Sequence, residues 1–286
     1  MNGSLSPLPP VTLVLIFALV ASTHEDVAFA GARSVSAWTD KINSKVRLVS
    51  AAVDANGQRE LLAGVQLRMS PGWKTYWKNP GDSGVPPAFD WSESKNLKAA
   101  EVLYPAPHRF ADAGGTAIGY EGEVVFPVRL TPERDGEPIE LRLNFSYGLC
   151  KDLCIPNEVA LELKVEEGTG KAETLLLETF LAQVPKPPAP NLLPRVVDAR
   201  FKSGGGTPEL IVDAAFPPDA AVSDLFVYAG DSFISVPSPI GPPVDGTQRF
   251  VLSFASPAEV DALKGKTLAL TLVSDLGSTE TLWKAE

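Results

Sequence analysis

The sequence predicts a mainly β protein built around an antiparallel β-sandwich, and three observations lead to this fold class. Short runs with strand character follow one another at close spacing from Lys45 to Val165. The 23 Gly and 26 Pro make up roughly one sixth of the 286 residues, which suits a turn-rich β protein better than a helical bundle. No helical period separates the runs, which favours antiparallel pairing over a parallel sheet with crossover helices.

The strands of this first region are predicted from alternation and from turn residues. Lys45–Val53 alternates polar and apolar residues, and Asn56-Gly57 supplies a hairpin turn before Leu61–Met69. Asp135-Gly136 is a second hairpin signal, between the first two of the later runs. These later predicted strands are Val124–Leu130, Pro138–Tyr147 and Val159–Val165.

A helix and a proline-rich segment follow the predicted sandwich. Glu173–Val184 places Leu176, Leu177, Phe180 and Leu181 at helical spacing. The prolines that come next cannot continue a helix and predict a stiff extended linker. We therefore expect a signal segment at 1–30, a sandwich domain with its helix at 31–184, a linker at 185–194 and a second, smaller β domain at 195–286.

The second region is also predicted to be β-rich. Ser256-Pro257-Ala258-Glu259 reads as a capping box with Pro at the first helical position, which predicts one short helix. No motif in this region indicates a chemistry. The predicted strands are Glu209–Ala215, Leu225–Ala229, Arg249–Phe254 and Thr267–Val273.

The first thirty residues have the pattern of a secretory signal. Val11–Ala21 is apolar but shorter than the roughly 20 residues that span a bilayer. Ala28-Phe29-Ala30 follows it and matches the pattern that signal peptidase cleaves. No Lys or Arg precedes the apolar run, so an uncleaved anchor stays as the alternative. The expected product is an exported, periplasmic protein.

Charge and composition exclude several classes of function. A net charge of −10 argues against nucleic acid or anionic lipid as the main partner. With two His and two Cys in the whole chain, a zinc site is not expected, and neither is any other cofactor.

The two cysteines are the strongest candidates in the sequence for reactive residues. Cys150 and Cys154 lie between two predicted strands, and a three-residue spacer can bring two such side chains into disulfide range across a turn. A bond that closes so short a loop adds only about 2 kcal/mol of loop entropy, which favours a redox-active pair. A structural staple stays open as the alternative. The C-x-x-x-C spacing, without a βαβ unit, does not support a thioredoxin fold.

Two further candidates rank below the cysteines. Trp73, Tyr76, Trp77 and Trp91 could stack on a sugar, but aromatic residues of a β-sandwich more often pack in its core. His108 has no evident nucleophile beside it in the sequence, so we expect a surface loop residue, and a Cys/His hydrolase is disfavoured.

Three blocks of the sequence resemble the amino-terminal periplasmic domain of the DsbD/ScsB family of thiol:disulfide interchange proteins, the protein-disulfide reductases. They are GWKTYWKNPGDSG, YPAPHRFADAGGTAIGYEGEVVFPV and YGLCKDLCIP, in this order. The resemblance implies an immunoglobulin-like sandwich with Cys150 and Cys154 as the redox pair. It also implies that Phe110 lies in the loop that covers the disulfide with an aromatic ring.

The resemblance further implies an electron donor and electron acceptors. In the family, electrons reach this domain from a membrane-embedded partner and pass to other exported thiol proteins. Full members continue into a multi-helix membrane segment and a thioredoxin-like domain, whereas this sequence stops at Glu286, so we expect the donor on another chain. The alternative is a non-catalytic binding or adaptor protein in which the disulfide is structural.

Overall fold

The computed structural model describes residues 34–55, 58–112, 115–165, 171–202, 206–230, 232 and 234–286. The predicted signal segment and the turn residues Asn56-Gly57 lie outside the described residues. The part from Ala32 onward forms one compact unit. The predicted division of this unit by a linker at 185–194 therefore stays a prediction.

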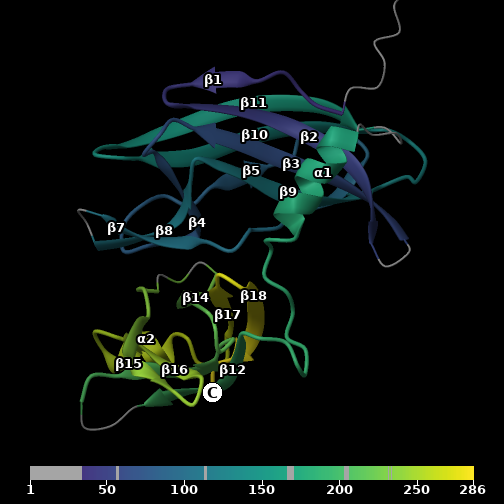
Figure 1. Ribbon diagram of the computed structural model, residues 1–286. Helices are drawn as coiled ribbons and strands as arrows, with labels where there is room; N and C mark the ends of the chain where they lie inside the picture. The colour runs from purple at the N-terminus through teal and green to yellow at the C-terminus, as the bar shows by residue number, and fades with distance from the viewer. Residues whose placement is uncertain are drawn as a thin grey trace, which may run out of the picture. The chain divides into compact units, whose positions relative to one another are not determined.

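Two antiparallel sheets form the first region, as the sequence predicts (Figure 1). The first sheet consists, in spatial order, of β1 (Thr39–Lys41), β2 (Ser44–Ala55), β3 (Gln58–Met69), β9 (Glu123–Pro132) and β6 (Leu97–Val102). The second consists of β11 (Cys154–Val165), β10 (Ile139–Cys150), β4 (Lys74–Gly81), β8 (Gly115–Glu121) and β7 (His108–Asp112), with β5 (Ala88–Asp90) paired to β10.

The core of the sandwich follows from the period-two alternation of its strands. In β11 the residues alternate between exposed and buried from Asn157 to Val165, so one face of this edge strand packs inward. Phe126 and Phe145 are buried in this core, with their ring centroids 6.4 Å apart. Phe145 stacks on Phe89 at a centroid distance of 4.8 Å and on Tyr147 at 4.7 Å.

The predicted helix covers the outer face of the first sheet (Figure 1). It is α1 (Lys171–Leu181), so it ends at Leu181 rather than at Val184. Leu177 is fully buried against Val49, Leu62 and Val125 of the sheet. Beyond the helix, Lys186 of the proline-rich segment forms a parallel bridge with Thr279, so this part of the segment is bonded to the C-terminal strand.

Two smaller sheets enclose the C-terminal core. The helix α2 (Pro257–Asp261) lies where the sequence predicts it, with buried Val260 packed in that core. One sheet consists of β12 (Arg195–Lys202), β13 (Glu209–Ala215), β16 (Thr247–Ser253) and β15 (Ser238–Val244). The other consists of β14 (Ser223–Tyr228), β17 (Thr267–Ser274) and β18 (Gly277–Lys284).

Two local predictions are wrong. Asp135-Gly136 does not close a hairpin, because β9 and β10 belong to different sheets and the segment between them crosses from one sheet to the other. Ser256 occupies the N-cap position of α2, but its side chain makes no capping hydrogen bond. Glu259 instead accepts a hydrogen bond from the Ala255 N–H, at 3.2 Å, so the reciprocal pair of a capping box does not form.

Neither helix of the described chain has the length and apolar character needed to cross a bilayer.

Candidate functional site

The two cysteines form a disulfide at the tip of the long β10–β11 hairpin. They are register partners at the last pair of the ladder, with Cα atoms 4.1 Å apart. Lys151, Asp152 and Leu153 form the exposed turn between them. Backbone pairing in the hairpin thus places the two cysteines directly opposite each other.

The two cysteines differ in exposure. Cys150 is 5% exposed and belongs to a small buried cluster with Tyr76 and Ala117. Cys154 is exposed at the start of β11. The hairpin therefore presents one half of the disulfide to solvent and buries the other.

The Tyr76 hydroxyl lies 3.3 Å from the Cys154 sulfur. Tyr76 itself is 2% exposed and reaches the sulfur from β4, the strand next to β10. A Cβ atom at Gly148 would lie 3.0 Å from the Tyr76 ring, and one at Gly84, where φ is +122°, would lie 2.3 Å from it. Glycine at these two positions leaves the space that the ring occupies.

Phe110 covers this cluster from β7. Its ring is half-buried and packs against the group formed by Tyr76, Ala117 and Cys150. The Lys74 ammonium lies 4.9 Å from the centre of the ring, within cation–π range. Because Phe110 pairs with Ala117 across the β7–β8 hairpin, the strand register fixes where the ring stands.

The remaining candidate residues of the sequence analysis do not form a second site. Tyr76 and Trp77 are buried, and Trp73 and Trp91 pack against the sandwich core, so these rings do not form an open sugar platform. His108 is exposed, as expected, but it lies on β7 rather than in a loop, with its ring 6.5 Å from that of Phe110.

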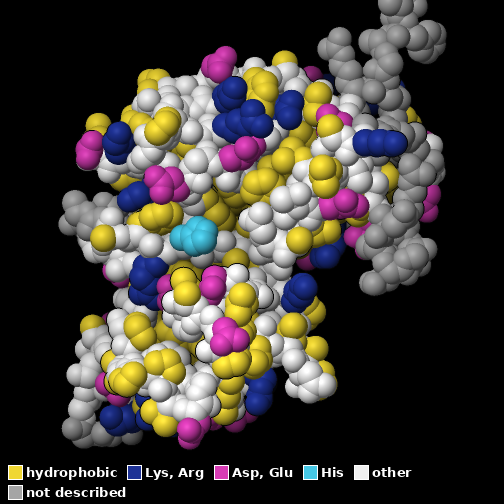
Figure 2. All heavy atoms as spheres, viewed as in Figure 1, with side chains coloured by type: hydrophobic (Ala, Val, Ile, Leu, Met, Phe, Trp, Pro, Cys, Tyr) yellow, Lys and Arg dark blue, Asp and Glu magenta, His cyan; other side chains and the backbone are white. Residues whose placement is uncertain are grey.

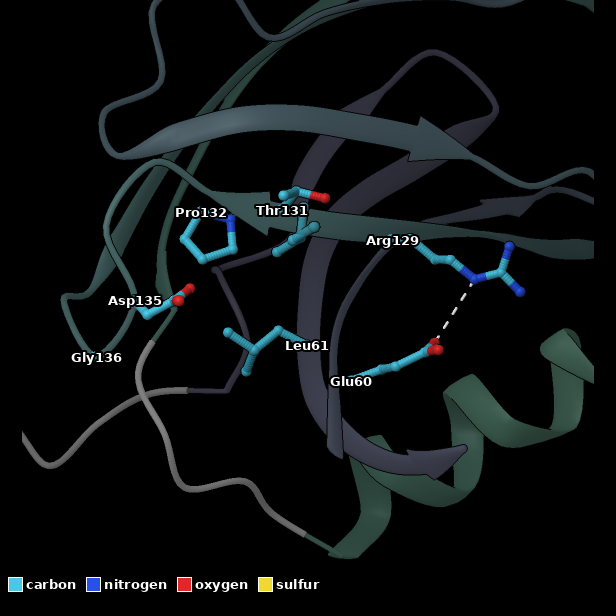
Figure 3. Close-up of a pocket in the computed structure, with 8 residues that line it drawn as sticks. Glu60, Leu61, Arg129, Thr131, Pro132, Asp135 and Gly136 are labelled. Carbon is cyan, nitrogen blue, oxygen red and sulfur yellow. Dashed lines mark ion pairs between the residues drawn. The ribbon is translucent and has the colours of Figure 1, made fainter. Parts of the chain in front are cut away.

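No cluster of three or more His, Cys, Asp or Glu side chains that could hold a metal occurs among the described residues. Lys and Arg side chains are interspersed with Asp and Glu on the face of the molecule in Figure 2. A hollow at the end of β3 and β9 is lined by Leu61, Thr131 and Pro132 and is bordered by the Arg129–Glu60 ion pair (Figure 3). Neither cysteine lines it, so it is separate from the disulfide site.

Residues 46–166 match the family described as "Thiol:disulfide interchange protein DsbD, N-terminal". Over these residues the chain is similar to the N-terminal domain of DsbD. The match includes both cysteines, Tyr76 and Phe110, and it confirms the resemblance that the three sequence blocks indicate. The match supports a thiol:disulfide interchange domain over residues 46–166.

The same fold occurs in the N-terminal periplasmic domain of ScsB from Proteus mirabilis. The two structures superpose with a TM-score of 0.68 and 19% sequence identity, over 89% of this chain and all of that one. The likeness therefore extends past the DsbD N-terminal segment into the C-terminal sheets and concerns the fold. A search of curated proteins finds no match to this sequence.

Proposed function

We propose that this chain is an exported thiol-disulfide exchange protein that passes electrons through Cys150 and Cys154. One observation carries the proposal: the pair is held at a hairpin tip with Cys154 exposed and Cys150 buried. An attacking or attacked sulfur must be reachable by a second protein, whereas the resolving sulfur needs to reach only its neighbour. Cys154 is therefore the sulfur that forms the mixed disulfide, and Cys150 resolves it.

The transfer to an acceptor takes two steps. The Cys154 thiolate attacks the acceptor's disulfide, so a mixed disulfide forms and one acceptor sulfur leaves as a thiolate. Cys150 then loses its proton and attacks the Cys154 sulfur, which restores the Cys150–Cys154 disulfide and releases the second acceptor thiolate. Two electrons pass to the acceptor, and its two thiolates take up protons from solvent.

The pair must then be reduced again by a dithiol donor. The DsbD relationship supports a membrane-embedded donor and exported thiol proteins as acceptors. The donor's two thiolates repeat the same exchange in the opposite direction, so the donor is oxidised to a disulfide and no cofactor takes part in this step. Phe110 shields the disulfide from other thiols between these encounters, because its ring packs over the cluster that contains Cys150.

Single-cysteine variants test the assignment of the two sulfur atoms. Cys150→Ser retains the exposed Cys154, and Cys154→Ser retains the buried Cys150. With oxidised glutathione as the probe, we expect Cys150→Ser to form the mixed disulfide faster than Cys154→Ser, as followed by intact mass. Equal rates, or no adduct on either variant, would contradict the proposal.

A further inference from the structure

The two strands that carry Tyr76 and Phe110 also carry residues that bind the C-terminal region. In β4, Tyr76 is followed by Trp77, and in β7, Phe110 is preceded by Arg109. Successive side chains of a strand point to opposite faces, so each strand has one residue at the disulfide cluster and the next on its other side. The partners on that other side belong mostly to a single strand, β14.

Arg109 makes the most specific of these contacts. Its Nε and Nη2 atoms donate to the two carboxylate oxygens of Asp224, at 3.0 Å and 2.5 Å, and Nη2 also donates to the Pro237 carbonyl, at 2.9 Å. The two side chains are 27% and 17% exposed. A bidentate, partly buried pair fixes geometry better than an exposed one, because its planar fork leaves few alternative orientations.

β4 also contacts β14, at Phe226 and Val227, which lie two and three residues after Asp224. Trp77 packs edge-to-face on Phe226 at a centroid distance of 5.9 Å. The Asn79 amide donates to the carbonyl of Val227 at 2.8 Å and to that of Ile234 at 3.2 Å. Asn79 is buried, so these bonds satisfy an amide that would otherwise be costly to enclose.

β7 lies at the edge of its sheet, so contacts outside the sheet contribute to holding it in place. β7 ends the strand order of its sheet and pairs with β8 on one side. A strand with one neighbour in its ladder is held more weakly than a central strand, and the Arg109–Asp224 pair adds a second attachment one residue from the Phe110 ring.

We propose that β14 is a brace for the disulfide site, and that Arg109, held by Asp224, is a positioning residue that keeps the Phe110 ring over the cysteine cluster. This gives the C-terminal region a function in the exchange reaction, although it contributes neither cysteine. The inference rests on the proposed function, since it assumes that Phe110 shields the pair. Loss of the Asp224 charge would weaken the bidentate pair and leave Arg109 with its bond to the Pro237 carbonyl, so β7 would be held less firmly against the cluster.

Asp224→Asn tests the brace, with the reduction rate of the oxidised full chain by tris(2-carboxyethyl)phosphine as the readout. We expect Asp224→Asn to raise this rate by roughly two- to ten-fold, the lower part of the range that coupling between contacting residues produces. In a Phe110→Ala background, the same change should add nothing, because the shield is already gone. If the rate increase of Asp224→Asn came from a loss of stability alone, it would appear equally in both backgrounds.

Asp213→Asn is the matched control. Asp213 also pairs with arginine in the C-terminal region, but its partners are Arg200 and Arg249. The substitution Asp213→Asn should leave the rate of disulfide reduction unchanged. The brace is refuted if Asp224→Asn reacts like the parent, if it acts equally in the Phe110→Ala background, or if the control also accelerates reduction. If Phe110→Ala itself has no effect, the shielding part of the proposed function fails together with the brace; if only Asp224→Asn has none, the brace alone fails.

Discussion

The hydrogen-bonding contact between the Tyr76 hydroxyl and the Cys154 sulfur changes character when the disulfide is reduced. In the oxidised pair the sulfur carries no proton, so the hydroxyl donates to a neutral acceptor at 3.3 Å. A Cys154 thiolate would accept the same bond with a negative charge, and hydrogen bonds to ionised groups are the stronger ones. Tyr76 should therefore favour the reactive form of Cys154.

Tyr76→Phe should lower the reactivity of the reduced pair. Without the hydroxyl, the thiolate fraction of Cys154 falls, while each thiolate becomes somewhat more nucleophilic. The net expectation is an alkylation rate with iodoacetamide about three-fold slower at pH 7, with the pH–rate profile moved to higher pH.

Tyr147→Phe is the control for this change. It removes a buried hydroxyl contact of similar kind, 2.9 Å from the Ser44 hydroxyl, on a side chain that packs in the sandwich core. The iodoacetamide profile of this variant should match that of the parent. A Tyr76→Phe profile that also matches the parent would contradict a role for the hydroxyl at the sulfur.

The sequence predicts part of the site at the residue scale and misses the rest for a physical reason. The cysteine pair is local, so its spacing and its place between two strands are enough to predict a bond across a turn. Tyr76 lies 78 residues from Cys154, and Arg109 lies 115 from Asp224. Such contacts depend on which strands become neighbours, and a single sequence gives no information about that.

At the scale of elements, α1 has a clear energetic function because it closes the outer face of the first sheet. Leu177 is fully buried there, whereas Leu175 on the other face is 66% exposed. Leu177→Ala should therefore lower the free energy of unfolding by about 2–5 kcal/mol, as measured by urea titration. Leu175→Ala should change it by no more than about 0.5 kcal/mol. Equal losses at the two positions would show that the helix is not packed in this way.

Strands with clear alternation are predicted well, and strands rich in Pro and Gly are not. Glu209–Ala215 is predicted with the bounds it has as β13. β15 reads SPIGPPV and is not among the predicted strands, yet it pairs with β16 at the end of its sheet, where a residue without an N–H is tolerated. The β7–β8 hairpin is missed for a similar reason. Glycines in β8 interrupt the alternation of polar and apolar residues from which a strand is predicted, and the segment forms a strand because it pairs with its neighbours in the fold.

At the scale of the whole molecule, the ion pairs of the C-terminal sheet predict a dependence of stability on acid. Hydrogen bonds from Arg249 and Arg200 hold the pKa of Asp213 below its usual value, with Arg249 as the larger cause. A carboxyl group whose pKa is lowered by folding contributes stability above its unfolded pKa, near 4, and loses it as the pH falls further.

Asp213→Asn should therefore flatten the fall in stability below about pH 4, relative to the parent. Thermal midpoints between pH 7 and pH 2.5 measure this slope. The same substitution at the exposed Asp219 should leave the slope as it is in the parent. A parallel slope for Asp213→Asn and the parent would show that this ion-pair cluster does not link folding to pH.

The central claim is that Cys150 and Cys154 exchange electrons rather than staple a turn. The reduction potential of the pair tests it most directly, by equilibration of the full chain against glutathione buffers with thiol alkylation as the readout. We expect a value above about −300 mV, in the range of exchangeable disulfides. A value well below this would describe a bond that the glutathione pool cannot reduce, as structural disulfides are, and would favour an adaptor protein with a stapled hairpin.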